Sequence, residues 1–366
     1  MRVVITGGGT GGHLFPGLAV CTLLCARRPG TEVLFVGSST AVEARILPRL
    51  GHRFRGLTVS RVSGVGLRGQ VRTALELPPA VREARAILRE FKAQVVFGVG
   101  GYASFATVLA AALLRVPRVI HEQNAYPGLA NRWLGRMATA VAVSFPDTGR
   151  FFPRGKVHLT GNPIRPEIRP GDSGAARARL GLERTRLTVL VFGGSQGAHR
   201  LNLAVQEALP QLREARERVQ FLHATGERDL QTLRQAYEAS GVTAKAEAFF
   251  DDMATVYQAA DFAICRAGAG TIFELATVGK PALLVPYPHA AHDHQRLNAE
   301  AMVSAGAAWI VPDQGCDGPR ILASLRSALE KPGELRTMGG RAGALARPDA
   351  ADLIAALLER VARSTA

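Results

Sequence analysis

Apolar residues along this chain gather in short runs, and between the runs they recur every three or four positions. Short runs bounded by turn residues predict buried strands, and the helical recurrence predicts amphipathic helices. Because strands and helices alternate, we expect an α/β chain with parallel sheets covered on both faces. The predicted strands are residues 2–6, 32–36, 95–98, 118–122, 140–143, 157–160, 188–192, 219–224, 245–249, 262–265, 282–285 and 308–310, and the predicted helices include 16–27, 41–50, 104–114, 129–137, 201–212, 229–240, 271–278, 295–305 and 350–363.

Two glycine-rich turns, one in each half, predict two domains. Residues 7–13 (GGGTGGH) follow the first strand, and residues 193–197 (GGSQG) follow the strand at 188–192. A strand that breaks into glycines before a helix lets backbone N–H groups approach an anion at the helix start. We therefore expect two doubly wound, Rossmann-like domains that face each other across a cleft. The predicted bounds are 1–161, completed by a C-terminal helix at 345–366, and 162–344.

Composition narrows the class of protein. The chain has 366 residues, 47% of them hydrophobic, and a net charge of +15. We expect no membrane span, because no apolar run reaches about 18 uncharged residues, and the N-terminus shows no signal peptide. The basic excess fits either solvated helix faces or an anionic partner. Nucleic acid is disfavoured, because zinc spacings, lysine-rich tails and RNP-type aromatic motifs are missing.

Cysteine spacing predicts neither a disulfide framework nor a metal site, because no CxxC pair occurs. Cys21 and Cys25 lie one helical turn apart on an apolar stripe, so we expect both to be buried.

The glycine turns match neither common nucleotide motif. A dinucleotide fold needs an acidic residue at the end of its second strand, where this chain has Val36-Gly37-Ser38-Ser39. The second turn also lacks such an acid, and neither glycine run continues into the Lys-Ser/Thr of a Walker A loop. These absences argue against a nicotinamide enzyme and a P-loop enzyme.

A third cluster of small residues begins the helix after the strand at 262–265. Arg266 precedes Ala267-Gly268-Ala269-Gly270-Thr271, and Glu274 follows one turn later. Small residues at a helix start form an anion site. Glu274 is either a surface carboxylate near the helix dipole or an acceptor for two ribose hydroxyls. Further polar residues, His292, His294 and Gln295, follow the exit of the next strand, where ligands bind in parallel sheets.

Taken together, these motifs resemble the MurG family over essentially the whole chain. The resemblance rests on 7–17, 98–102 (GVGGY), 121–124 (HEQN), 161–165 (GNPIR), 193–198 (GGSQGA) and 265–274, which occur in the family's order and spacing. It implies a GT-B fold and an inverting transferase that moves N-acetylglucosamine from UDP-GlcNAc to lipid I, forming lipid II for peptidoglycan. It further implies peripheral attachment at the cytoplasmic face of the cell membrane.

The resemblance also implies roles for individual residues. Ser195, Gln196 and Arg165 would meet the UDP diphosphate, Phe250 would line the uracil pocket, Glu274 would hold the ribose, and Gln295 would contact the sugar. The wider donor set comprises Thr10, Gly11, Gly12, Asn124, Gly197, Arg266, Gly268 and Thr271. The acceptor set comprises Thr10, His13, Tyr102, Glu122, Asn124 and Asn131. The chain departs from the family pattern at Ala267 and Gly270, which removes one hydroxyl near the phosphates, and at Phe105 and His294.

The chemistry implied needs a base and a stabiliser for the departing UDP. The C4 hydroxyl of the acceptor sugar attacks the anomeric carbon, and helix starts with Arg165 stabilise the charge without a metal. Asp251 and Asp252 are adjacent and precede a helix, so we expect capping from them and no metal cofactor. His13 has a suitable pKa range for the general base, or it only hydrogen-bonds the acceptor pyrophosphate.

Other functions remain open from the residues alone. A UDP-GlcNAc 2-epimerase or a transferase with another acceptor would use the same fold, and a basic nucleic-acid or lipid-binding module would need no catalysis. For membrane contact, residues 64–89 combine leucines and valines with arginines. We expect Pro78 and Pro79 to interrupt any single helix there and docking to be shallow. The segment could equally be an amphipathic stretch packed on its own domain.

Overall fold

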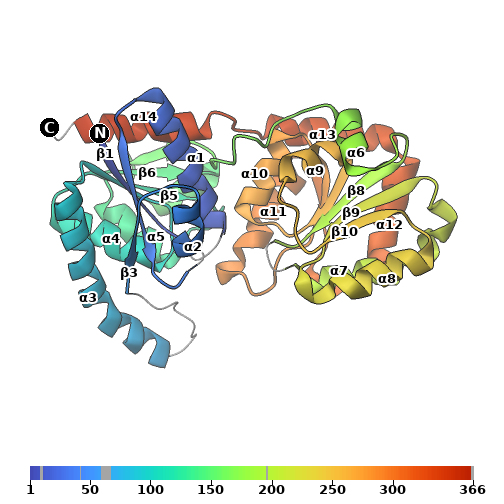
Figure 1. Cartoon of the computed structure of the whole chain (residues 1–366), viewed down its shortest axis with the longest axis horizontal. Helices are drawn as coiled ribbons and strands as arrows, with labels where there is room; N and C mark the ends of the chain where they lie inside the picture. Colours follow the sequence, from blue (N-terminus) through green and yellow to red (C-terminus); the bar gives the residue numbers. More distant parts are fainter. Residues whose placement is uncertain (9–10, 42, 59–66, 195–196, 364–366) are drawn as a thin grey trace. The chain divides into compact units, whose positions relative to one another are not determined.

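The computed structural model describes residues 1–8, 11–41, 43–58, 67–194 and 197–363. The chain divides into two compact units, Met1–Arg165 with Arg347–Ala366, and Pro166–Ala346. Each unit is a parallel sheet flanked by helices (Figure 1). The prediction of two Rossmann-like α/β domains is therefore confirmed.

The first unit contains a parallel sheet of seven described strands. The chain leaves the centre of the sheet in one direction through β1 and β2 and in the other through β4 and β5, as in a doubly wound fold. In sheet order the strands are β3 (Phe54–Leu57), β2 (Glu32–Ser38), β1 (Arg2–Thr6), β4 (Val95–Gly98), β5 (Arg118–Glu122), β6 (Ala140–Val143) and β7 (Val157–Leu159).

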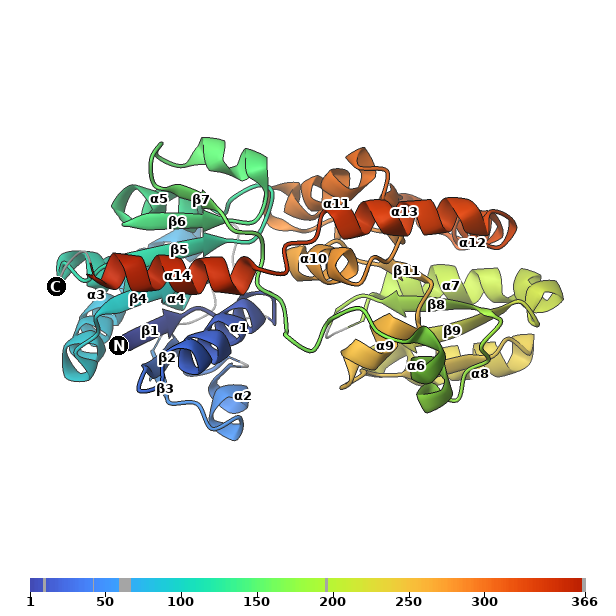
Figure 2. The same cartoon turned by 90° about the horizontal axis from the view of Figure 1, so that it is seen from above.

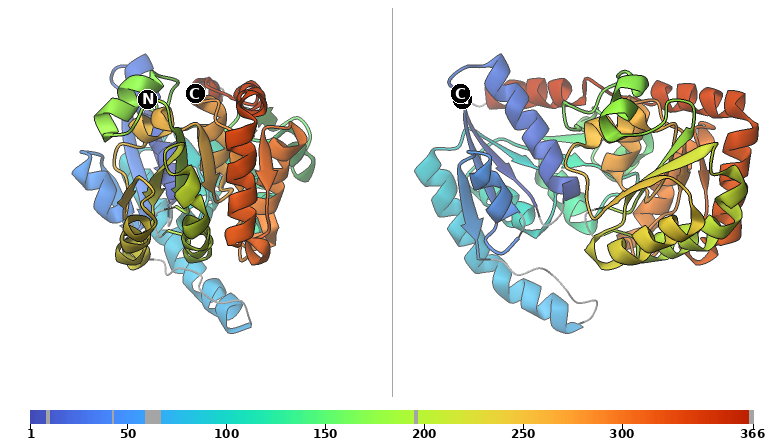
Figure 3. Two further views of the ribbon diagram at one scale, coloured as in Figure 1. Left: turned by 90° about the vertical axis from the view of Figure 1, so that its right-hand side faces the viewer. Right: turned by 45° about the vertical axis from the view of Figure 1, so that its right-hand side comes forward.

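Helices cover both faces of this sheet because successive strand residues point to opposite sides. Val3 and Ile5 of β1 pack with the helices α1 and α14, whereas Val4 packs with α3 and α4 on the other face. Figures 2 and 3 show α14, at the end of the chain, beside α1 near its beginning. The helices of this unit are α1 (Gly11–Arg27), α2 (Glu43–Arg49), α3 (Leu67–Phe91), α4 (Tyr102–Leu113), α5 (Leu129–Met137) and α14 (Ala350–Arg363), with a 3-10 turn, η1 (Pro146–Phe151).

The prediction that Pro78 and Pro79 interrupt the helix is wrong, because α3 continues through both of them. Each proline removes one N–H from the helical hydrogen-bond ladder and crowds the preceding turn. The helix continues because the turns that follow pack on the sheet, where Ala84 and Leu88 are buried. Tertiary packing therefore outweighs the local penalty.

The second unit contains a parallel sheet of six described strands. Val189 and Val191 of its central strand pack against α7 and α12, which form the core on one face. The strands in sheet order are β10 (Ala244–Glu247), β9 (Val219–Ala224), β8 (Leu187–Phe192), β11 (Phe262–Cys265), β12 (Ala282–Leu284) and β13 (Ala308–Ile310). The helices are α6 (Ser173–Leu180), α7 (His199–Leu212), α8 (Leu230–Ser240), α9 (Met253–Ala259), α10 (Ala269–Thr277), α11 (His294–Ser304), α12 (Gly318–Glu330) and α13 (Pro332–Ala344).

One cysteine prediction is wrong. Cys21 is buried but Cys25 is exposed, because the buried face of α1 runs through Gly17, Val20, Cys21 and Leu24. Among the described residues, no helix combines the length and the apolar character needed to cross a membrane.

Candidate active site

In the first unit, the glycine turn after β1 packs directly on the turn after β4. A Cβ atom at Gly101 would lie 2.8 Å from the carbonyl oxygen of Gly8, and one at Gly7 would lie 2.3 Å from Cγ2 of Val99. Gly100 and Gly101 also have φ angles of 102° and 88°, which side chains disfavour. Only glycine lets these two turns meet at the carboxyl edge of the sheet.

His13 lies in the first turn of α1, against this pair of turns. A Cβ atom at Gly100 would stand 3.0 Å from Nε2 of His13, so the imidazole packs on the bare backbone of the second turn. Gly11 and Gly12 start the same helix, while Thr10 falls outside the described residues. His13 therefore sits at the carboxyl edge of β1 and β4, where parallel sheets bind ligands.

Glu43 is a carboxylate at this turn that sequence reasoning missed. It is 1% exposed, and its Oε1 accepts a hydrogen bond from the backbone N–H of Ser38 at 3.2 Å. A Cβ atom at Gly8 would lie 2.0 Å from the same oxygen. Glu43 thus packs under the first glycine turn, and nothing in its sequence neighbourhood signals this contact.

Glu122, at the end of β5, is buried and surrounded by donors from its own loop. Its Oε1 accepts from the backbone N–H and the side-chain amide of Asn124, at 3.0 and 3.2 Å. Its Oε2 accepts from Nδ2 of Asn131 at 2.8 Å and from the N–H of Gly128 at 3.3 Å. Burial raises the pKa of Glu122, and the four donors oppose that rise. The carboxylate therefore ties the loop after β5 to the first turn of α5.

His121, the residue before Glu122, is a buried neutral imidazole. Its Nε2 lies 3.2 Å from the carbonyl oxygen of Gly161 and 3.2 Å from Oγ of Ser144. Desolvation lowers the pKa of His121 to about 4, although the hydrogen bond to the carbonyl oxygen of Gly161 opposes this change.

The remaining predicted acceptor residues lie at the same edge. Tyr102 begins α4 and is half-buried; desolvation and then the charge of Glu76 raise its pKa, so its hydroxyl stays protonated. Arg165, predicted to meet the UDP diphosphate, belongs to this unit and stacks over the ring of Phe15, with its guanidinium carbon 5.0 Å from the ring centroid. The structure thus gathers His13, Tyr102, Glu122, Asn124 and Asn131 on neighbouring elements of one unit.

In the second unit, the glycine turn after β8 packs on the turn after β9. Gly197 has a φ angle of 73°, and a Cβ atom there would lie 2.1 Å from the carbonyl oxygen of Thr225. Ser195 and Gln196 lie outside the described residues. Phe250 follows β10 and is 6% exposed. Asp252 caps α9 by accepting the N–H of Thr255 at 3.1 Å, so the capping prediction is confirmed for Asp252.

The start of α10 fits the predicted anion site. Gly268 is its N-cap residue, and a Cβ atom at Gly270 would meet no atom within 4 Å. Thr271 is half-buried in the same turn. The first N–H groups of a helix have no partner within the helix and carry its positive end. Because no side chain crowds the helix at Gly270, this first turn is compatible with the close approach of an anion.

Glu274 is oriented by a residue that sequence reasoning missed. Its Oε2 accepts a hydrogen bond from the hydroxyl of Tyr257 at 2.8 Å. Tyr257 is fully buried and packs edge-on against Phe192, with ring centroids 5.8 Å apart. A rigid core residue therefore holds this half-buried carboxylate in one orientation.

Gln295 is also held by its amide oxygen. Oε1 accepts from the backbone N–H groups of Ala267 at 3.2 Å and Tyr287 at 3.0 Å. Because these donors occupy the oxygen, the amide nitrogen is the group left to donate to another partner. The loop before it is strained, since His292 and Asp293 both have positive φ angles.

The Nη1 atom of Arg266 is paired with groups of the protein itself. This nitrogen lies 2.5 Å from Oδ1 of Asp313 and donates to the carbonyl oxygens of Val285 and Pro286. The sequence suggested a charge at the edge of the anion site, and the structure shows that this arginine also joins the ends of β11 and β12. Asp313 is distant in sequence, so no local signal indicated the pair.

The chain matches the Glycosyltransferase family 28 N-terminal domain over residues 3–143 and the C-terminal domain over residues 188–354. It is 45% identical over 356 residues to the UDP-N-acetylglucosamine--N-acetylmuramyl-(pentapeptide) pyrophosphoryl-undecaprenol N-acetylglucosamine transferase of Geobacter metallireducens, covering 97% of each chain. The crystal structure of Acinetobacter baumannii MurG is similar at a TM-score of 0.79 and 31% identity, over 98% of this chain and 99% of that one. A UDP-GlcNAc 2-epimerase from Neisseria meningitidis, at a TM-score of 0.68 and 14% identity over 98% and 100% of the chains, shares the fold.

Proposed function

The chain belongs to the MurG members of glycosyltransferase family 28, and on that premise we propose that it transfers N-acetylglucosamine from UDP-GlcNAc to lipid I. The C4 hydroxyl of the MurNAc sugar attacks the anomeric carbon with inversion, and the products are lipid II and UDP. The observation that carries this proposal is 45% identity, over 97% of both chains, to a transferase named for this reaction.

The second unit supplies the donor groups. The N-terminal turn of α10 stabilises the negative charge that builds on the departing UDP. Glu274, oriented by Tyr257, accepts hydrogen bonds from the ribose, and the amide nitrogen of Gln295 donates to the sugar. Arg165, which belongs to the first unit, adds positive charge for the diphosphate. The reaction then needs no metal ion, because helix N–H groups and a guanidinium stabilise the negative charge on the departing UDP.

The first unit supplies the base. His13 takes the proton of the attacking hydroxyl, since an imidazole titrates near neutral pH. Its position against the bare backbone of Gly100 leaves the ring few orientations. Tyr102 and Asn124, at the same edge, offer polar groups to the acceptor, and the loop that carries Asn124 is fixed by Glu122.

Release of UDP tests the proposal. UDP-GlcNAc is mixed with a lipid I analogue, UDP is measured by a coupled assay, and the lipid product is identified by mass. We expect UDP only when both substrates are present, with one added N-acetylhexosamine per acceptor. Conversion of UDP-GlcNAc without an acceptor would indicate an epimerase, and no reaction at all would indicate a binding module.

We also propose that the first unit attaches the enzyme to anionic membranes without inserting. Two surfaces compete for this role. Residues 64–89 carry Arg68, Arg72 and Arg82, although the side chains of 67–75 lie outside the described structure. On α5, Leu129 and Trp133 are 56% and 62% exposed, and the guanidinium of Arg136 lies 5.1 Å from the Trp133 ring. Exposed aromatic and basic side chains together favour a membrane interface.

Liposome co-sedimentation separates the two surfaces. Binding should require anionic lipid and fall with salt, at about 1 kcal/mol per arginine near the surface. If residues 64–89 dock, the variant with Arg68, Arg72 and Arg82 changed to Gln binds weakly while Trp133→Ser binds normally. The reverse pattern would assign docking to α5. If both variants bind as the wild type does, neither residues 64–89 nor α5 forms the docking surface.

A further inference from the structure

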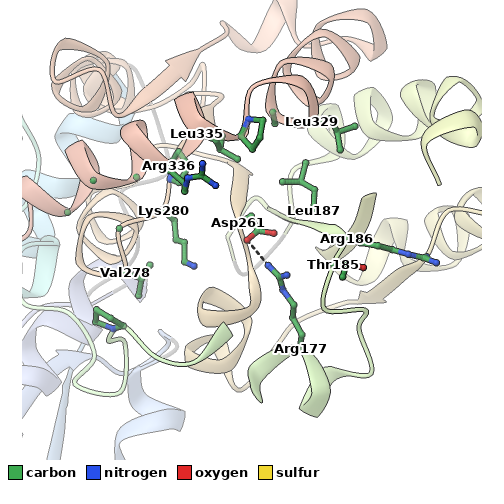
Figure 4. A pocket seen from close by; sticks show the side chains of 18 of the residues that line it. Arg177, Thr185, Arg186, Leu187, Asp261, Val278, Lys280, Leu329, Leu335 and Arg336 are labelled. Carbon is green, nitrogen blue, oxygen red and sulfur yellow. Dashed lines mark ion pairs between the residues drawn. The ribbon is translucent and has the colours of Figure 1, made fainter. Parts of the chain in front are cut away.

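The second unit contains a large cavity at the edge of its sheet opposite the predicted donor residues. Its volume is about 1040 Å³, and it is lined by the start of β8, the end of α10 and one face of α13 (Figure 4). The donor residues Gly268, Glu274 and Gln295 do not line it. Helix α10 thus begins at the predicted UDP site and ends at this second cavity.

Basic side chains dominate the cavity wall. Five cations line it, against two carboxylates, Asp261 and Glu217. Both carboxylates are already neutralised: Asp261 pairs with Arg177 at 2.5 Å, and Glu217 pairs with Arg186 at 2.6 Å. Asp261 also accepts the backbone N–H of Thr188 with its second oxygen, at 2.8 Å. The other three cations, Arg218, Lys280 and Arg336, have no carboxylate within 4 Å among the described residues.

Lys280 is the central group of this wall. It follows Gly279, whose φ angle of 61° ends α10 and allows the N–H of Lys280 to bond the carbonyl oxygen of Leu275 at 2.9 Å. Figure 4 shows its side chain directed toward the Arg177–Asp261 ion pair. Desolvation lowers the pKa of Lys280, Asp261 opposes this change and Arg177 adds to it. The nearby carboxylate is already paired with Arg177, so an added anion would stabilise the charged form of this half-buried ammonium.

The cavity wall also lets a ligand approach closely. Gly340 and Gly343 of α13 line it, and a Cβ atom at either would meet nothing within 4 Å. Pro332 places the first turn of α13, with its positive end, at the same wall. Three unneutralised cations and a helix start around one cavity match a group with two or more negative charges.

We propose that this cavity binds the phosphate groups of a small anionic ligand through Arg218, Lys280 and Arg336. The site is separate from the UDP site and does not depend on the transferase activity. A soluble diphosphate and a phospholipid headgroup carry the same chemistry, so the experiment distinguishes these two sources.

Lysine NMR tests the proposal at the site itself. The chain has five lysines, Lys92, Lys156, Lys245, Lys280 and Lys331, so reductive ¹³C-methylation gives few signals, and Lys280→Arg identifies one of them. Inorganic pyrophosphate is titrated into the free enzyme and again with UDP at saturation, because UDP fills the donor site and also carries a diphosphate that could compete for the cavity. We expect a saturable shift of the Lys280 signal, while the Lys92, Lys156 and Lys245 signals stay in place.

Two arginine variants complete the test. Arg336→Gln should weaken the pyrophosphate response by about tenfold or more, the loss expected for one charged hydrogen bond. Arg326→Gln is the matched control, because Arg326 is exposed on α12 and does not line the cavity. A shift seen only with phosphatidylglycerol vesicles, and not with phosphatidylcholine or pyrophosphate, would identify a headgroup as ligand. No saturable shift with either probe, or equal responses of the two variants, would overturn the proposal.

Discussion

Glu122 in the first unit and Glu274 in the second are both carboxylates at the carboxyl edge of a parallel sheet, yet their surroundings differ. Glu122 is buried, and four donors from its own loop and α5 fill the four lone-pair positions of its oxygens. Glu274 is half-buried and is oriented by Tyr257 through one oxygen. Contact of Glu122 with a substrate would require it to give up an internal bond. The same residue type can therefore fix a loop in one unit and, in the other, remain partly exposed where our proposal places the ribose.

The largest effect should come from the proposed base of the first unit. His13→Ala should lower kcat by about 10²–10⁴-fold, the usual contribution of a general base. Binding of UDP, measured by calorimetry, should change little, because His13 lies in the unit that we assign to the acceptor. Loss of UDP-GlcNAc binding with intact lipid I binding would reverse the assignment of the two units.

The structural role of Glu122 predicts a loss of stability. Glu122→Ala leaves the side chains of Asn124 and Asn131 and two backbone N–H groups without their acceptor, at a cost of about 3 kcal/mol in the free energy of unfolding. Chemical denaturation measures this change. An unfolding free energy equal to that of the wild type would show that the loop does not depend on its carboxylate.

Both units should lose stability in acid through a buried histidine. Burial lowers the pKa of His121 to about 4 and that of His223, bonded to Tyr237 and Asn202, to about 3. Because the unfolded chain binds a proton below pH 6.5 and the folded one does not, stability is full above that pH. It is lost as the pH falls toward these values, by about 3 kcal/mol for His121.

Urea denaturation at pH 7, 6 and 5 measures this loss, and NMR of the two imidazoles assigns it. If either ring titrates near pH 6.5 in the folded protein, that histidine makes no contribution to acid sensitivity.

Glu274 should affect binding of the donor more than it affects stability. Glu274→Ala should raise the KM for UDP-GlcNAc by about 10- to 100-fold, since a charged hydrogen bond contributes about 1.5–3 kcal/mol. Tyr257→Phe provides the matched test, because it removes the orienting hydroxyl alone and should raise KM by a smaller factor. Unchanged UDP affinity in Glu274→Ala would remove this carboxylate from the donor site and end the contrast with Glu122.

The smallest expected effect is that of a chelator. If helix N–H groups and Arg165 stabilise the leaving UDP, activity should be the same in EDTA as in added Mg²⁺. Loss of activity in EDTA that only Mg²⁺ or Mn²⁺ restores would show that a metal ion helps to stabilise the leaving UDP.

The sequence predicted most strands, because buried parallel strands are uninterrupted apolar runs such as Val95–Gly98. It missed β3, whose residues Phe54–Leu57 contain only two large apolar side chains. It also missed α6, which lies in a segment of turn-forming residues and is fixed by the cap of Asp172 and the left-handed Gly181. Edge elements rely on a few local contacts that periodicity does not record.

The positions of the candidate site residues were predictable, but their hydrogen bonds were not. Motifs place Glu274 at a helix start and Glu122 at a strand end. The bond from Tyr257 and the pair of Arg266 with Asp313 join residues that only the folded chain brings together. Polar pairs distant in sequence leave no pattern in a single sequence. The different hydrogen-bond partners of Glu122 and Glu274 could therefore be identified only in the folded structure.

The return of α14 to the first unit has a consequence for synthesis. Ile354, Leu357 and Leu358 of this helix complete the core formed with Val3, Ile5 and Leu14. On the ribosome, the first unit is made first, yet this core stays open until its final described helix has been translated. The second unit, made later, has all its strands before that point. We therefore expect the order of folding to be the reverse of the order of translation, with apolar surface of the first unit exposed to chaperones meanwhile.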